Sequence, residues 1–154
     1  MQYQDLVCDF AQRTRANLEA IEWLRNQSQH LPAYEITQLI NSLLGLLVFP
    51  QQEFVNSIPA TPLTQLQFQG WPIPKIVGNF QQVKDLRQLV RYLRNAIAHF
   101  NIEFTADAKD QINGLRVWND LPNNGPTNWK AELSIGDVKV LADKFVDLVL
   151  SRNS

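Results

Sequence analysis

The feature that most constrains the fold of this chain is a regular apolar stripe in its middle third. Apolar residues recur at spacings of 4, 3, 4 and 3, at Leu86, Val90, Leu93, Ile97 and Phe100. At about 100° per residue, this spacing gathers the side chains on one face of a helix, which must pack against a core or a partner helix. We therefore expect a helix over about residues 80–100, with a capped start at residues 79–82.

Polar residues lie on the other side of the same helix. On an ideal helix Asn95 lies nearly opposite the stripe, and His99 lies within about 40° of Asn95. Arg91 flanks this pair, whereas Arg94 lies at the border of the stripe, about 140° from His99. One helix therefore groups Asn95 with His99 and leaves Arg94 apart. A second copy of the helix, supplied by a dimer, would bring an arginine to the histidine.

Three other segments show helical periodicity. Residues 4–27 predict a long amphipathic helix, and residues 33–49 predict a helix that is apolar on almost every face, typical of a central core helix or an oligomer contact. Residues 135–151 predict the last helix. Ser134 and Asp137 have the spacing of a capping box at its start.

The segment of residues 58–78 is rich in proline and glycine and predicts a long loop. Trp71 within it is expected to pack against the body of the protein. After residue 100 the apolar period changes to two, which predicts two or three short antiparallel strands with a turn at residues 122–126. The expected fold class is mainly α: a four-helix bundle with a small antiparallel β hairpin or meander inserted between the third and last long helices. One domain is expected to span residues 1–154.

Composition excludes several classes of protein. The chain has 154 residues, is 45% hydrophobic and carries a net charge of −1, so no global basic field attracts nucleic acid and any RNA contact must be local. The single cysteine, Cys8, excludes an intramolecular disulfide and is expected to be a small buried residue. Neither a signal peptide nor a membrane span is visible, because the longest apolar run, residues 36–49, is short and interrupted by polar residues. We expect a cytoplasmic protein with no membrane contact.

Arginine and histidine together can cleave RNA without a metal. The 2′-hydroxyl attacks the adjacent phosphorus, a histidine takes that proton or protonates the leaving oxygen, and an arginine stabilises the developing charge. The sequence shows no phosphate-binding glycine loop, no nucleophile elbow and no metal-ligand spacing, and His30 lies far from His99 along the chain. We therefore expect neither a metal nor another cofactor. Two proton-transfer groups serve this chemistry best, which again favours a symmetric pair of chains.

The segment Leu93–Phe100 closely resembles the signature of the HEPN superfamily: an arginine, usually followed by a polar residue, then four to six variable residues and a histidine. Here the polar residue is Asn95 and the spacing is four. The helical layout is similar as well, with the motif near the end of the third long helix. The apolar helix ending in Val48-Phe49-Pro50 and the strand-rich segment after the motif resemble the pEK499 p136 subfamily, so the expected bundle is HEPN-like over nearly the whole chain.

The resemblance implies a homodimer in which two motifs face each other across a composite cleft, and endoribonuclease activity of a toxin or an anti-phage defence protein. It implies that Arg94 and His99 are catalytic and that Asn95 orients the substrate or the histidine. An antitoxin or other regulatory protein is then a candidate partner besides the RNA substrate. HEPN toxins paired with a nucleotidyltransferase carry a modified tyrosine two residues after the histidine. Asn101 stands there, which puts that regulation in doubt.

Alternatives remain open at this stage. Arg87, Arg91 and Arg94 recur at spacings of 4 and 3 and form a basic ribbon, which either contacts RNA or is a solvated face. Arg94 could equally be a surface arginine, and His99 a residue that complements the dipole at a helix C-terminus. The chain would then be a non-catalytic helical HEPN module for dimerisation or for RNA or protein binding. Trp118 and Trp129 could stack unpaired bases, although packing is expected.

Overall fold

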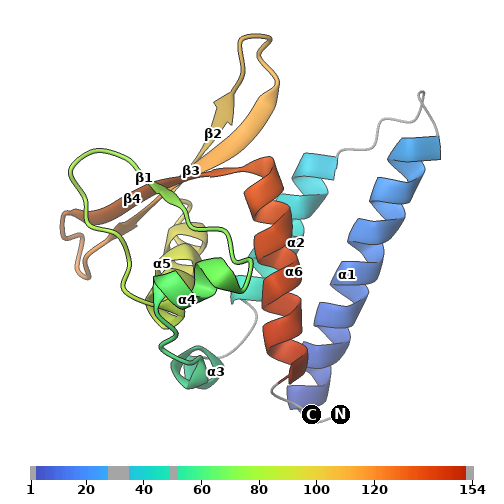
Figure 1. Ribbon diagram of the computed structural model, residues 1–154, viewed down its shortest axis with the longest axis horizontal. Helices are drawn as coiled ribbons and strands as arrows, with labels where there is room; N and C mark the ends of the chain where they lie inside the picture. Colours follow the sequence, from blue (N-terminus) through green and yellow to red (C-terminus); the bar gives the residue numbers. More distant parts are fainter. Residues whose placement is uncertain (1–2, 28–34, 49–51, 152–154) are drawn as a thin grey trace.

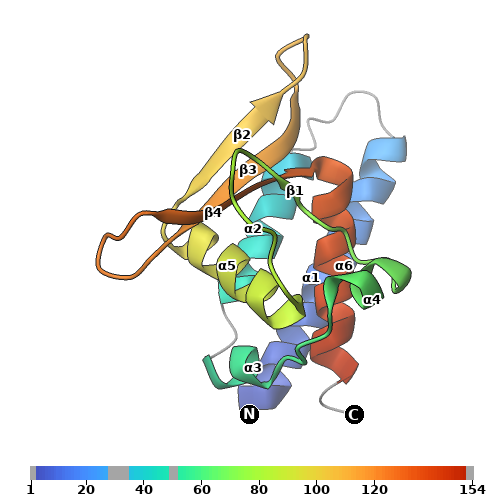
Figure 2. The same ribbon diagram turned by 60° about the vertical axis from the view of Figure 1, so that its left-hand side comes forward.

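A four-stranded antiparallel sheet and a layer of helices make up the structure, a computed structural model that describes residues 3–27, 35–48 and 52–151 (Figure 1). The long helices of the described residues are α1 (Tyr3–Gln27), α2 (Glu35–Val48), α5 (Leu86–Ala98) and α6 (Ile135–Ser151). Helices α5 and α6 pack against the sheet, α2 packs against both of them, and α1 packs on α2 and α6 on the side away from the sheet (Figures 1 and 2).

The sheet corrects the expected fold class. Its strands are β1 (Lys75–Ile76), β2 (Ile102–Ala106), β3 (Ile112–Asp120) and β4 (Thr127–Ser134), in the order β1-β4-β3-β2. The fold is therefore mixed α/β, and the prediction of a mainly α four-helix bundle with a small hairpin is wrong. The period-two segments do form strands, but they build a sheet that carries one wall of the core. The fourth strand, β1, lies within the segment predicted to be a loop. The sequence does not predict it, because a strand of two residues is too short to show alternation.

One face of the sheet is buried against the helices. Leu115 lies opposite Leu133, and Val117 lies opposite Ala131, so these side chains share a face. All four are buried, and so is Trp129. A strand buried on one face alternates apolar and polar residues, which is the pattern visible in the sequence.

The outer face of the sheet carries a cross-strand ion network. On β3, Arg116 donates from Nε and Nη2 to Glu132 of β4, at 2.9 and 2.6 Å, and from Nη1 to Glu103 of β2 at 3.1 Å. The hydrogen bonds to Glu132, and then those to Glu103, raise the pKa of the Arg116 guanidinium. One side chain thus links three neighbouring strands.

Helix α2 is the central core helix, one of the two interpretations left open by its apolar faces. Leu39, Leu43, Leu46 and Leu47 are buried against α1, α5 and α6. Gly45 lets α1 approach closely, since a Cβ at this position would collide with the Phe10 ring. The predicted range of residues 33–49 agrees with Glu35–Val48, and its remaining positions lie outside the described residues.

Helix α5 is shorter than its stripe indicates. It begins at Leu86, where the side chain of Asp85 accepts a hydrogen bond from the Gln88 N–H at 2.8 Å as the N-cap. The predicted cap at residues 79–82 is therefore wrong. The helix ends at Ala98, so Phe100 does not belong to the stripe and is 85% exposed.

Other sequence predictions are confirmed. The capping box of α6 forms, with the Asp137 N–H donating to Ser134 Oγ and the Ser134 N–H donating to Asp137 Oδ2, both at 3.0 Å. Trp71 is buried, and the predicted loop around it also contains α4 (Leu63–Phe68). Helix α3 (Gln52–Ser57) precedes that loop and places Phe54 edge-on against Phe145 of α6. Within the described ranges, no helix is both long enough and apolar enough to cross a membrane.

Candidate functional site

A pocket of about 680 Å³ opens between the C-terminal half of α5 and the turn that joins β3 to β4. Figure 2 shows this turn projecting beside the end of α5, while the other hairpin turn projects away from the helices. Amide side chains dominate the lining. The residues that line it are Arg91, Tyr92, Asn95, His99, Asn101, Asn119, Asp120, Leu121, Pro122, Asn123, Asn124 and Asn128.

Two residues of the HEPN-like motif line this pocket together. His99 is the C-cap of α5, and its N–H donates to the Asn95 carbonyl at 3.0 Å. Its side chain is exposed. Asn95, one turn earlier, is half-buried and donates from Nδ2 to Asn119 Oδ1 of β3 at 3.1 Å. The grouping of Asn95 with His99 on one side of the helix is therefore as the periodicity predicts.

The backbone after His99 makes a sharp turn. The Phe100 N–H donates to the Ile97 carbonyl at 3.2 Å, and the Asn101 N–H donates to the Ala96 carbonyl at 2.8 Å. This is the bonding of a Schellman motif, whose left-handed position is usually a glycine. Here that position is Phe100, with φ 58°. A phenylalanine in this conformation stores backbone strain directly beside the motif.

A chain of hydrogen bonds fixes the amides at the base of the pocket. Asn95 donates to Asn119, Asn119 Nδ2 donates to Asn128 Oδ1 at 2.6 Å, and Asn128 Nδ2 donates to the Tyr92 hydroxyl at 3.1 Å. Gln88 Nε2 also donates to that hydroxyl at 3.1 Å. The chain runs from α5 through β3 and β4 and back to α5. Because Asn119 is only 4% exposed, its two bonds at the centre are the best shielded from water.

A β-bulge places Asn128 in this chain. Asn119 pairs with Trp129, but Asp120 pairs with Thr127, so Asn128 has no partner in the register. An extra residue in one strand re-aims its side chain, and such bulges are frequent beside active sites. Without the bulge, the alternation of β4 would send Asn128 to the face opposite Trp129.

The rim of the pocket is also tied together. Asp120 accepts hydrogen bonds from Asn101 Nδ2 at 2.9 Å and from Thr127 Oγ1 at 2.6 Å. The turn beyond it contains Asn123 and Asn124 with φ 59° and 55°, a conformation that asparagine tolerates better than most residues. The predicted turn at residues 122–126 is therefore present, and it forms one wall of the pocket.

The structure separates the three arginines of the basic ribbon. Only Arg91 lines the pocket, where it is exposed. Arg87 donates from Nε to the Ile58 carbonyl at 2.7 Å, which directs it toward the loop before α4. Arg94 is half-buried and is not among the lining residues, as its predicted angle from His99 requires. A catalytic role for Arg94 and RNA contacts by Arg87 and Arg91 stay predictions.

The sequence analysis missed the residues that hold the motif in place: Tyr92, Asn119 and Asn128. A signal existed for Asn119, because the inward alternation of Leu115 and Val117 continues with a polar residue at this position. Trp129, considered for base stacking, is fully buried and packs against the Tyr92 ring with centroids 5.6 Å apart.

The remaining candidate residues are Trp118, Cys8, His30 and possible metal ligands. Trp118 of β3 lies under the Lys130 ammonium, 5.5 Å from the ring centroid. Cys8 packs against the core but is half-buried, less than the prediction of a buried residue. His30 lies outside the described residues. In the described part of the chain, no three His, Cys, Asp or Glu side chains gather as metal ligands.

Comparison with known proteins identifies the family. No curated protein and no solved structure matches the chain. The family model described as HEPN pEK499 p136 matches residues 1–154, which is the whole sequence. This match confirms the resemblance carried by Arg94, Asn95 and His99 and by the arrangement of the segments around them. The chain therefore belongs to the HEPN pEK499 p136 family.

Proposed function

We propose that the protein is a metal-independent endoribonuclease that acts as a homodimer with a composite Arg/His active site, and that it serves as a toxin or an anti-phage defence effector. The observation that carries this proposal is the opening of Asn95 and His99 of the family motif onto one large pocket that also contains Arg91. Small-molecule sites have volumes of about 300–1,000 Å³, so this pocket can take a nucleotide.

The chemistry follows from the residue types. The ribose 2′-hydroxyl attacks the adjacent phosphorus, and the 5′-oxygen of the next nucleotide leaves. The exposed His99 imidazole can take the proton from the nucleophile or give one to the leaving oxygen. The Arg94 guanidinium, with two parallel N–H groups, would stabilise the negative charge that develops on the phosphoryl oxygens. The products would carry a 2′,3′-cyclic phosphate and a 5′-hydroxyl.

The separation of Arg94 from the pocket favours a dimer. Arg94 does not line the pocket that contains His99, so one chain alone offers the reaction a histidine and Arg91. A second copy facing the first across the ends of the α5 helices would add its own motif. The Phe100 side chain, exposed beside His99, suits burial in such an interface.

A non-catalytic HEPN module is the second candidate. The involvement of Asn95 in the hydrogen-bond chain favours it, because this bond gives a motif residue a structural role. In that case His99 would only cap the helix, and the pocket would bind without cleaving. An antitoxin or other regulatory protein would remain a candidate partner under either function.

The test compares wild type, His99→Ala and Arg94→Ala on total RNA, with thermal melts of all three. We expect loss of a general acid–base to lower the cleavage rate by about 10²–10⁴-fold. Loss of the charge-stabilising arginine should lower it by about 10²–10³-fold. Melting temperature should change little for His99→Ala, because that side chain is exposed. Equal cleavage by wild type and folded His99→Ala would leave the non-catalytic module as the function.

A further inference from the structure

The pocket has the composition of a site for a nucleobase. Tyr92, Leu121 and Pro122 contribute apolar surface to its lining, and six asparagines contribute amide groups. A base has the matching chemistry, because its two faces are apolar and its edge alternates hydrogen-bond donors with acceptors. Proteins that recognise unpaired RNA bases use this combination of flat contacts and hydrogen bonds to the base edge.

The amides form one continuous hydrogen-bond chain that ends at Gln88. Gln88 Oε1 accepts from the Lys84 N–H at 2.7 Å, so Gln88 must present its Nε2 to the Tyr92 hydroxyl. That hydroxyl receives a second bond from Asn128 and keeps its own proton for donation. At the other end of the hydrogen-bond chain, and considering only the described residues, the side-chain oxygen Oδ1 of Asn95 accepts no hydrogen bond. The Tyr92 hydroxyl proton and Asn95 Oδ1 therefore remain available, and both residues line the same pocket.

The charges of the pocket argue against a site for phosphate alone. Arg91 is the lining arginine, and the Asp120 carboxylate lies in the same pocket. A site that bound only phosphate would gather several cations and exclude a carboxylate. The amides suit a base instead, since asparagine can form two hydrogen bonds with a base edge. Arg91 and His99 then suit the phosphate attached to the same nucleotide.

We propose that this pocket binds one unstacked base of the RNA substrate and that its amides, anchored by Asn119, select which base is bound. This inference rests on the proposed function, because it names a subsite of the same active site. Base selection next to His99 would place the scissile phosphate at a defined nucleotide, and the protein would cleave RNA at preferred positions.

The experiment measures binding of fluorescein-labelled, 2′-O-methylated homopolymers of A, C, G and U by anisotropy, since these probes lack the 2′-hydroxyl that cleavage needs. We expect wild type to bind one homopolymer at least about fivefold more tightly than the others, the lower end of the discrimination by one bidentate contact. Asn119→Ala should reduce this ratio to below about twofold. Asn124→Gly removes one amide from the pocket lining and keeps the left-handed backbone of the exposed turn. It therefore tests the pocket without disturbing the hydrogen bonds of Asn119.

Asp110→Gly is the matched control. Asp110 has φ 56° in the other hairpin turn, outside the pocket, and its substitution should leave the ratio unchanged. Equal binding of all four homopolymers by wild type, no binding of any, or a preference that survives both pocket variants would overturn the inference. Cleavage of total RNA is assayed in parallel. Cleavage without base preference overturns only the base pocket, and base preference without cleavage overturns only the nuclease.

Discussion

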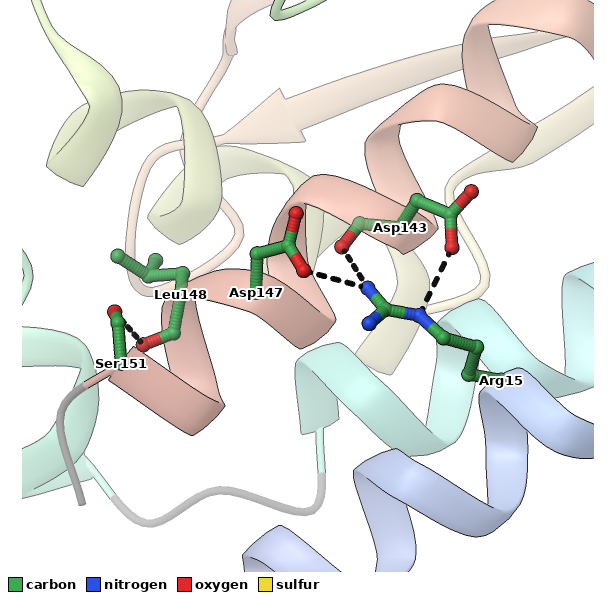
Figure 3. A network of polar contacts seen from close by, with 5 residues as sticks. All are labelled: Arg15, Asp143, Asp147, Leu148 and Ser151. Carbon is green, nitrogen blue, oxygen red and sulfur yellow. Dashed lines mark hydrogen bonds and ion pairs between the residues drawn. The ribbon is translucent and has the colours of Figure 1, made fainter. Parts of the chain in front are cut away.

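The protein uses polar side chains in two different ways, one between α1 and α6 and one between α5 and the sheet. Between the helices, Arg15 donates to Asp143 Oδ1 at 3.2 Å, to the Asp143 carbonyl at 2.9 Å and to Asp147 Oδ1 at 2.8 Å (Figure 3). Burial alone would lower the pKa of Arg15, but Asp147 and Asp143 raise it above its ordinary value. The guanidinium is engaged within the protein, beside a cavity of only about 80 Å³.

The second region, at the pocket, holds its polar groups by amide bonds instead of charges. Asn95, Asn119, Asn128 and Tyr92 orient one another and still line a space of about 680 Å³. The Arg15 guanidinium is held by two carboxylates and a backbone carbonyl of α6, whereas each amide side chain offers two donors and an acceptor. The ion pairs between α1 and α6 therefore join two helices, whereas the amides line an open pocket.

The largest effect on stability should come from the apolar side of α5. Leu93 is 1% exposed and lies on the buried side of α5, the helix that carries the motif. Leu93→Ala should lower the free energy of unfolding by about 2–5 kcal/mol, from lost transfer energy and a residual cavity. Chemical denaturation measures this change. A loss below about 1 kcal/mol would mean that polar contacts, and not apolar packing, mainly hold α5 in place.

The next effect should come from the centre of the amide chain. Asn119→Ala removes the hydrogen bonds to Asn95 Nδ2 and Asn128 Oδ1, each worth about 0.5–1.5 kcal/mol. RNA cleavage should fall as well, because Asn95 loses its anchor beside His99. Unfolding and cleavage are measured on the same preparation. A variant with lower stability but unchanged cleavage would show that the hydrogen-bonded amides have only a structural role.

The smallest effect should come from the ion pairs of Arg15 with Asp143 and Asp147. The carboxylates that pair with Arg15 are 65% and 63% exposed, so solvent screens both ion pairs. Exposed pairs are worth about 0.2–1 kcal/mol each, and we expect Arg15→Ala to cost no more than about 1–2 kcal/mol in total. Cleavage should not change. If Arg15→Ala reduced cleavage in the folded protein, the ion pairs between α1 and α6 would not be purely structural.

The sequence predicts the four long helices, because their apolar stripes are long and several of their boundaries have a local signal. The capping box at Ser134 and the end of α2 are examples. It does not predict the start of α5, since residues 79–82 resemble a cap while Asp85 is the residue that accepts the N-terminal hydrogen bond. The sheet is underestimated for a related reason. Strand β1 exists only through its pairing with β4, a contact between distant segments that no local pattern contains.

Part of the candidate site could likewise be predicted from the sequence, and part of it could not. Asn95 and His99 could be placed on one side of a helix from periodicity alone, and the separation of Arg94 from His99 follows from the same geometry. The pocket around them could not be predicted, because a β-bulge at Asn128 and a buried asparagine at Asn119 contribute to its lining. Both features depend on how β3 and β4 meet α5.

The most direct test of the proposed function is the chemistry of the RNA ends produced in excess EDTA. An RNA oligonucleotide is compared with the same oligonucleotide carrying a 2′-O-methyl group at the mapped cleavage position, and the products are analysed by mass spectrometry. Proton transfer by His99 and charge stabilisation by Arg94 predict a 2′,3′-cyclic phosphate end, undiminished by the chelator and absent from the methylated substrate. Cleavage that stops in EDTA and returns with Mg²⁺, or cleavage of the methylated substrate, would contradict the account.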